Sequence, residues 1–126
     1  MKFLCLGYYD AKSMDARPKA EIDAIMSQCR PFIEELHDTG QVVMDAGLDL
    51  ETRRLKLVRG KVEIVEGRVL EACSRIGGVF VIEARDMEDA IRVAAMHPTT
   101  RVSDGEQFGW AIEIRPIHTF WPADAA

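Results

Sequence analysis

The chain has 126 residues, of which 48% are hydrophobic and 29% are charged, and its formal net charge is −5. This length and composition predict one globular domain over residues 1–126, with 118–126 as a C-terminal tail. The negative charge and the dispersed Lys and Arg residues argue against a nucleic-acid-binding surface, because such a surface needs clustered positive charge.

The sequence gives no sign of export, membrane insertion or metal binding. No apolar run approaches the length of a membrane span, and the apolar stretch at Met1 is too short for a signal peptide. Cys5, Cys29 and Cys73 are an odd number without a C-x-x-C pair, so they predict neither a disulfide framework nor a zinc site. We therefore expect a cytoplasmic protein with no metal or cofactor, and with neither nucleic acid nor membrane as a partner.

The first half of the chain predicts a strand followed by a helix. The strand Phe3 to Tyr9 is apolar on both alternating faces, which is typical of the middle of a sheet. We expect Asp10 to Arg17 to be a loop, and Pro18 to lie in the first turn of a helix that ends near Gly40. Pro31 lies inside this helix, where it removes a hydrogen bond and crowds the preceding turn, so we expect a kink or a break there.

A second strand is predicted over Gln41 to Asp49. Regular alternation of polar and apolar residues then predicts a hairpin with arms 54–58 and 61–65, closed by Arg59-Gly60. Residues 66–75 are expected to connect this hairpin to the rest of the sheet.

The remaining elements are a strand, a helix and a last strand. Val79 to Ala84 is β-branched and aromatic, and Asp86 suits the N-cap of a helix from Met87 to Met96. Thr99 to Phe108 is expected to be a polar loop, and alternation predicts the last strand from Trp110 to Pro116.

This order of elements, β-α-β, a hairpin and β-α-β, indicates the α+β class: a ferredoxin-like antiparallel sheet with two helices on one face. Two helices cover only one face of the sheet, yet apolar residues are expected on the other face as well. They are Leu4, Leu6, Tyr8, Val79 and Val81. A second copy of the chain would cover them, so we expect a homodimer formed by sheet-to-sheet packing.

Three stretches carry a family resemblance: Met1 to Leu6 with the Tyr8-Tyr9 pair, Gly77 to Ala90, and Glu113 to Ile117. Together they resemble the YCII-related family, in the branch named for an Asp-Gly-Pro-Phe signature, over nearly the whole chain. At the place of that signature, this chain has Glu66-Gly67-Arg68-Val69. A site built on that turn is therefore not expected.

The resemblance implies a ferredoxin-like fold of the dimeric α/β-barrel type, in which two sheets face each other. It also implies a small-molecule pocket beside the interface. Some members of the wider family look like acid–base lyases that rely on a His and an Asp, whereas the family as a whole implies no single activity.

Three residues are candidates for acid–base catalysis. His97 follows the second helix directly and could act as a general acid or base, although a histidine at a helix end also suits the helix dipole. His37 and Asp45 flank the turn between the first helix and the second strand, so they could form a pair like the His and Asp of the wider family. The alternative for His37 is again a favourable interaction with the helix dipole, and the alternative for Asp45 is a solvated carboxylate facing a turn.

A ligand-binding group is expected on the sheet face that would meet the partner. Tyr8, Glu83 and Arg115 share this face if the side chains of the three strands alternate between the two sheet faces in the same phase. We expect Asp45 and His97 to reach the same cleft from the ends of their elements. Arg115 could bind an anionic ligand with two hydrogen bonds, whereas ion pairs between neighbouring strands are the alternative. A histidine beside a carboxylate in this cleft would hold its proton to higher pH.

Three functions remain open from the sequence. The first is a lyase or isomerase that uses acid–base residues. The second is a non-catalytic homodimer that binds a small metabolite. The third is a protein-interaction module whose sheet faces and aromatic tail, Phe120 and Trp121, contact another protein.

Overall fold

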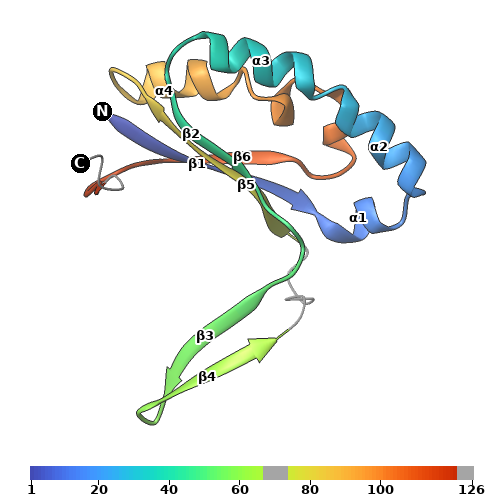
Figure 1. Cartoon of the computed structure of the whole chain (residues 1–126). Helices are drawn as coiled ribbons and strands as arrows, with labels where there is room; N and C mark the ends of the chain where they lie inside the picture. Colours follow the sequence, from blue (N-terminus) through green and yellow to red (C-terminus); the bar gives the residue numbers. More distant parts are fainter. Residues whose placement is uncertain (67–73, 122–126) are drawn as a thin grey trace.

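The computed structural model describes residues 1–66 and 74–121, and it is built on a four-stranded antiparallel sheet with helices on one face (Figure 1). The sheet has the strand order β2-β5-β1-β6, with β1 (Lys2–Asp10), β2 (Val42–Gly47), β5 (Ser74–Glu83) and β6 (Ala111–Pro116). The principal helices are α2 (Lys19–Ser27), α3 (Arg30–Asp38) and α4 (Met87–Ala94). The predicted α+β class is confirmed, and over the described residues the sheet remains open rather than closing into a barrel.

The first strand lies at the centre of the sheet, as its two apolar faces predict. β1 pairs with β5 on one side and β6 on the other, and both pairings are antiparallel. Phe3 lies opposite Ile82, and Cys5 lies opposite Phe80. All four side chains are buried against the helices, where they pack with Leu36 and residues of α4. The main core therefore occupies the part of the sheet nearest the start of β1.

The first predicted helix is broken in two near Pro31. α2 ends at Ser27, and α3 begins at Arg30, so that Pro31 falls in the first turn of the new helix. In that turn the missing N–H costs little, because the first N–H groups of a helix have no intrahelical partner. The predicted interruption is confirmed.

Two segments predicted as loops contain helical structure. Asp10 accepts a hydrogen bond from the backbone N–H of Lys12 and thereby starts a short helix, α1 (Ala11–Asp15). Two 3₁₀ turns, η1 (Pro98–Thr100) and η2 (Ser103–Glu106), lie between α4 and β6. The prediction of plain loops was wrong because these elements are too short to show a helical repeat in the sequence.

The hairpin forms a separate two-stranded sheet of β3 (Arg53–Val58) and β4 (Lys61–Glu66). Arg59 and Gly60 both have positive φ angles, of 50° and 77°, as a tight two-residue hairpin turn requires. The predicted hairpin is therefore confirmed. The predicted connection over 66–75 falls largely on residues 67–73, which lie outside the described residues, as do Cys73 and most of the segment in place of the family signature.

The second helix begins where the sequence predicts. The side chain of Asp86 accepts a hydrogen bond of 2.8 Å from the backbone N–H of Asp89, which is the geometry of an N-cap. Asp89 itself is buried and accepts hydrogen bonds from the backbone of Arg85 and the guanidinium of Arg92. These contacts hold the pKa of Asp89 at about 2, and together they fix the junction between β5 and α4.

The sheet face away from the helices, which we call the open face, carries the apolar residues that the sequence assigns to it. Val81 is buried by its neighbours in the sheet, whereas Leu4, Leu6 and Val79 are half-buried. At one end of this face the ammonium group of Lys2 lies 5.1 Å from the centre of the Phe120 ring. No helix among the described residues is both long and apolar enough to cross a membrane.

Candidate active site

A pair of glycines opens a cavity between the sheet and the helices. The core-facing positions of β1 run Phe3, Cys5 and Gly7, and Gly7 lies opposite Gly78 of β5. Since neither glycine has a side chain, the large residues that fill the core at Phe3 and Phe80 have no counterpart here. The result is a cavity of about 810 Å³ whose floor is the backbone of Gly7 and Gly78.

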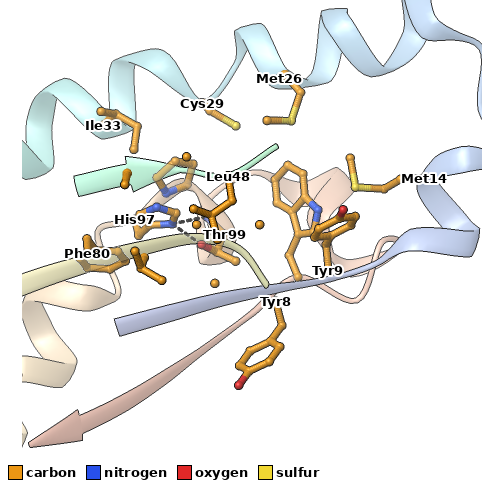
Figure 2. A pocket seen from close by; sticks show the side chains of 18 of the residues that line it. Tyr8, Tyr9, Met14, Met26, Cys29, Ile33, Leu48, Phe80, His97 and Thr99 are labelled. Atoms are coloured by element: carbon orange, nitrogen blue, oxygen red, sulfur yellow. Dashed lines mark hydrogen bonds between the residues drawn. The ribbon is translucent and has the colours of Figure 1, made fainter. Parts of the chain in front are cut away.

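The walls of this cavity are largely apolar and come from elements far apart in the sequence (Figure 2). They include Met14, Ile22, Met26, Ile33, Leu48 and Trp110. Met26 and Leu48 remain exposed to solvent by 47% and 48%, so they mark the entrance. A concave, largely apolar space with a few polar groups is the usual form of a small-molecule site.

His97 is held at one wall of the cavity by contacts on two sides. Its ring stacks on Phe80, with ring centroids 4.8 Å apart and an angle of 5° between the planes. The backbone N–H of Thr99 donates a hydrogen bond of 3.2 Å to Nδ1 of His97, and the Thr99 hydroxyl also contacts this nitrogen (Figure 2). Because Nδ1 accepts, the neutral imidazole carries its proton on Nε2.

Burial lowers the pKa of His97 to about 4, because a charged imidazolium would lose its hydration in this apolar space. The carboxylate of Asp45 acts in the opposite direction, and His37 lowers the pKa further. The expectation that a carboxylate would let this histidine hold its proton to higher pH is therefore wrong for His97. At neutral pH, His97 is an uncharged hydrogen-bond donor.

This pKa predicts a loss of stability on acidification. Between the ordinary histidine pKa of 6.5 and about 4, the unfolded chain binds a proton that the folded chain excludes. The free energy of unfolding should thus fall as the pH drops from 6.5 to 4, by up to about 3 kcal/mol from this group. Urea unfolding at pH 7 and pH 4.5 measures the fall, which should be smaller in His97→Asn. Equal falls in the two proteins would contradict the assignment.

His37 and Asp45 form the pair that the sequence predicts. Nε2 of His37 lies 2.8 Å from Oδ2 of Asp45, so α3 and β2 hold the two side chains in contact. A carboxylate only accepts hydrogen bonds, hence Nε2 of His37 carries a proton and Nδ1 of the neutral ring is free to accept one. A histidine oriented in this way by a carboxylate is the usual arrangement of a general base.

The residues predicted to share one cleft lie on two sides of the sheet. Of the five, Asp45 and His97 line the cavity under the helices, where His37 joins them. Tyr8 also borders this cavity, but its ring points away from it (Figure 2), and its hydroxyl donates a hydrogen bond of 2.9 Å to Glu113 on the open face. This contact raises the pKa of Tyr8. The expected convergence of all five residues is therefore not found.

Glu83 and Arg115 also belong to the open face. Glu83 pairs with Lys2 at 3.1 Å and with the N-terminal ammonium at 3.3 Å, and these contacts lower its pKa. Arg115 lies opposite Leu4 in the sheet. Lys2 and Glu83 are cross-strand neighbours, so Glu83 has the ion pair between strands that the sequence offered as its alternative role.

Several residues of the cavity were not singled out from the sequence. Gly7 and Gly78 form its floor, while Tyr9, Met14 and Trp110 form part of its wall. A glycine at a core-facing position of an otherwise apolar strand is a signal for such a space. This signal can be interpreted only when the strand register is known, because the residue opposite a single glycine could fill the space that the glycine leaves.

No group of three or more His, Cys, Asp or Glu side chains suited to a metal ion is found within 1–66 and 74–121. Cys5 and Cys29 are free thiols, and burial raises the pKa of Cys5 to about 12 and also raises that of Cys29. Because the thiolate is the reactive form, neither cysteine is a ready nucleophile. The polar side chains that line the cavity are instead His37, Asp45 and His97, together with Tyr9, Asp15, Arg17, Lys19 and Thr99.

Comparison with known proteins places the chain in a family. A search among curated proteins gave no match to this sequence. The profile of the YCII-related domain matches residues 1–116, a range that includes each described strand and helix and the residues that line the cavity. The chain therefore belongs to the YCII-related family.

Proposed function

We propose that the cavity under the helices binds a small metabolite with an apolar body and a carbonyl group, and that the protein moves a proton on this ligand in a lyase- or isomerase-type reaction. One observation carries the proposal. The His37–Asp45 pair and the uncharged His97 line the same largely apolar cavity. The apolar walls suit the body of the ligand, and the three polar residues suit its reactive group.

The two histidines have different roles in this proposal. Nδ1 of His37 accepts a proton from the carbon beside the ligand carbonyl. Asp45 holds the His37 ring in place and stabilises the positive charge that forms on it. His97 donates a hydrogen bond from Nε2 to the carbonyl oxygen as negative charge develops there. A neutral imidazole with a lowered pKa is suited to this second role.

The predicted homodimer is part of the same proposal. The half-buried apolar residues of the open face support sheet-to-sheet packing of the dimeric α/β-barrel type, in the cytoplasm, where free thiols persist. The partner would then cover Tyr8, Glu83 and Arg115, which serve here as interface residues. The cavity opens on the opposite side, so it stays accessible in such a dimer.

A metabolite panel read by thermal unfolding tests whether the cavity binds a ligand, since a ligand raises the unfolding temperature by mass action. Gly7→Val should abolish this rise, because its side chain fills the floor of the cavity. The fold should tolerate the change, since a Cβ at Gly7 meets nothing closer than the Gly78 carbonyl oxygen at 3.6 Å. Ala111→Val on the open face of β6 is the matched control and should respond as the parent does.

The outcome separates three cases. A ligand that is bound and turned over supports the enzyme, whereas a ligand that is bound and unchanged supports the metabolite-binding dimer. If Gly7→Val responds to the ligand as fully as the parent, the cavity is not the binding site.

A further inference from the structure

The hairpin β3–β4, which we call the arm, presents an apolar face to solvent. In its register Leu55 lies opposite Ile64, and Leu57 lies opposite Val62, so all four side chains share one face. They expose 64%, 60%, 72% and 64% of their surface, respectively. The arm projects from the body on the side of the sheet away from the helices (Figure 1).

An arm of this kind requires a partner. A two-stranded hairpin alone is at best marginally stable in water, and it gains stability by packing its apolar face against another surface. Four large aliphatic side chains in one continuous patch are also unusual on the surface of a soluble monomer. The opposite face of the arm is more polar and carries Arg54, Lys56, Lys61 and Glu63 beside Val58 and Val65.

We propose that the apolar face of the arm packs against a second copy of this chain, so that each protomer of a homodimer contacts the other through its arm. We call this contact the clasp. The charge distribution favours this occupant. Residues 53–66 contain five Lys or Arg and two Asp or Glu, whereas the rest of the chain contains eleven and nineteen. The arm is therefore basic and the body acidic, so the body of a second copy attracts it.

The position of the arm supports the same occupant. It projects on the side of the open face, where Met44 and Ile76 are 42% and 41% exposed beside the half-buried Leu4 and Leu6. A copy that covers the open face would lie beside the arm. In a two-fold dimer each arm then reaches the partner in the same way, which doubles the contact without requiring a new surface. The clasp goes beyond the proposed reaction and does not depend on the cavity.

Sedimentation velocity of the full chain over a range of micromolar concentrations tests the clasp. The parent should be a dimer, and the double variant Leu55→Thr/Leu57→Thr should raise its dissociation constant by about tenfold or more. Thr favours strands, and both sites are exposed, so the fold should persist by circular dichroism. The matched control, Val58→Thr/Val65→Thr, makes the same kind of change on the other face and should dimerise like the parent.

A second measurement covers the case in which the variant loses its arm structure. In a sample that mixes isotope-labelled and unlabelled parent chains, the Ile64 methyl group should show nuclear Overhauser contacts to the other chain. If the parent protein stays monomeric at tens of micromolar, the proposal is overturned. This holds even if the arm binds some other protein. A dimer that tolerates both leucine substitutions and lacks intermolecular contacts to Ile64 overturns it equally.

Discussion

Replacing His37 by glutamine should lower the turnover of the cavity's ligand by about 10²–10⁴-fold, the usual contribution of a positioned general base. Glutamine keeps a polar group near Asp45 but cannot take a proton. His37 is bonded to Asp45 at 2.8 Å and lines the cavity, so binding of the ligand should change far less than turnover. Steady-state kinetics and the ligand's effect on unfolding temperature measure the two quantities separately.

The matched control is His118→Gln. His118 lies beyond β6, outside the cavity. Within the described residues its ring forms a hydrogen bond with the hydroxyl of Thr119. Its variant should keep the parental turnover. Asp45→Asn should also lower turnover, because the amide cannot stabilise a protonated His37 as a carboxylate does. Parental turnover in His37→Gln would show that His37 is not the base.

Replacing Phe80 by alanine should lower the free energy of unfolding by about 3–5 kcal/mol, the usual cost of removing a fully buried aromatic ring. Phe80 is 1% exposed and lies in the centre of the core, opposite Cys5. The change also removes the ring on which His97 stacks, so it should enlarge the cavity and loosen the His97 ring.

Urea denaturation measures this loss. Ile76→Ala, in the same strand but 41% exposed, is the control and should cost less than half as much. Phe80→Leu keeps most of the volume and should be milder than Phe80→Ala, yet it lacks the flat ring. A cost below about 1 kcal/mol for Phe80→Ala would contradict the position of the core.

Much of the fold could be predicted because local and global signals agree. The doubly apolar Phe3–Tyr9 stretch predicts a central strand, and β1 is central. The ring of Pro31 predicts a break, and two helices meet there. The tight turn at Arg59-Gly60 and the cap at Asp86 likewise depend on a few neighbouring residues. Elements of three to five residues were missed because a helical repeat needs more length than they have.

The site was only partly predictable. His37 and Asp45 are eight residues apart across one turn, so their contact follows from local geometry. The cavity instead depends on Gly7 facing Gly78 across two strands far apart in the sequence, which only the register reveals. The state of His97 depends on its burial and on the hydrogen bond that the backbone N–H of Thr99 donates to it, and neither can be read from the residue type. For these reasons the sequence prediction placed residues from both faces of the sheet in one site.

Methionine methyl groups provide the most direct test of where the ligand binds. Met14 and Met26 line the cavity under the helices, whereas Met44 is 42% exposed on strand β2 opposite Val81 of the open face. In a protein labelled with ¹³C at the methionine methyls, the ligand found in the panel should shift the Met14 and Met26 signals and leave Met44 unchanged. A shift at Met44 with Met14 and Met26 unmoved would place the ligand on the open face and contradict the cavity as its site.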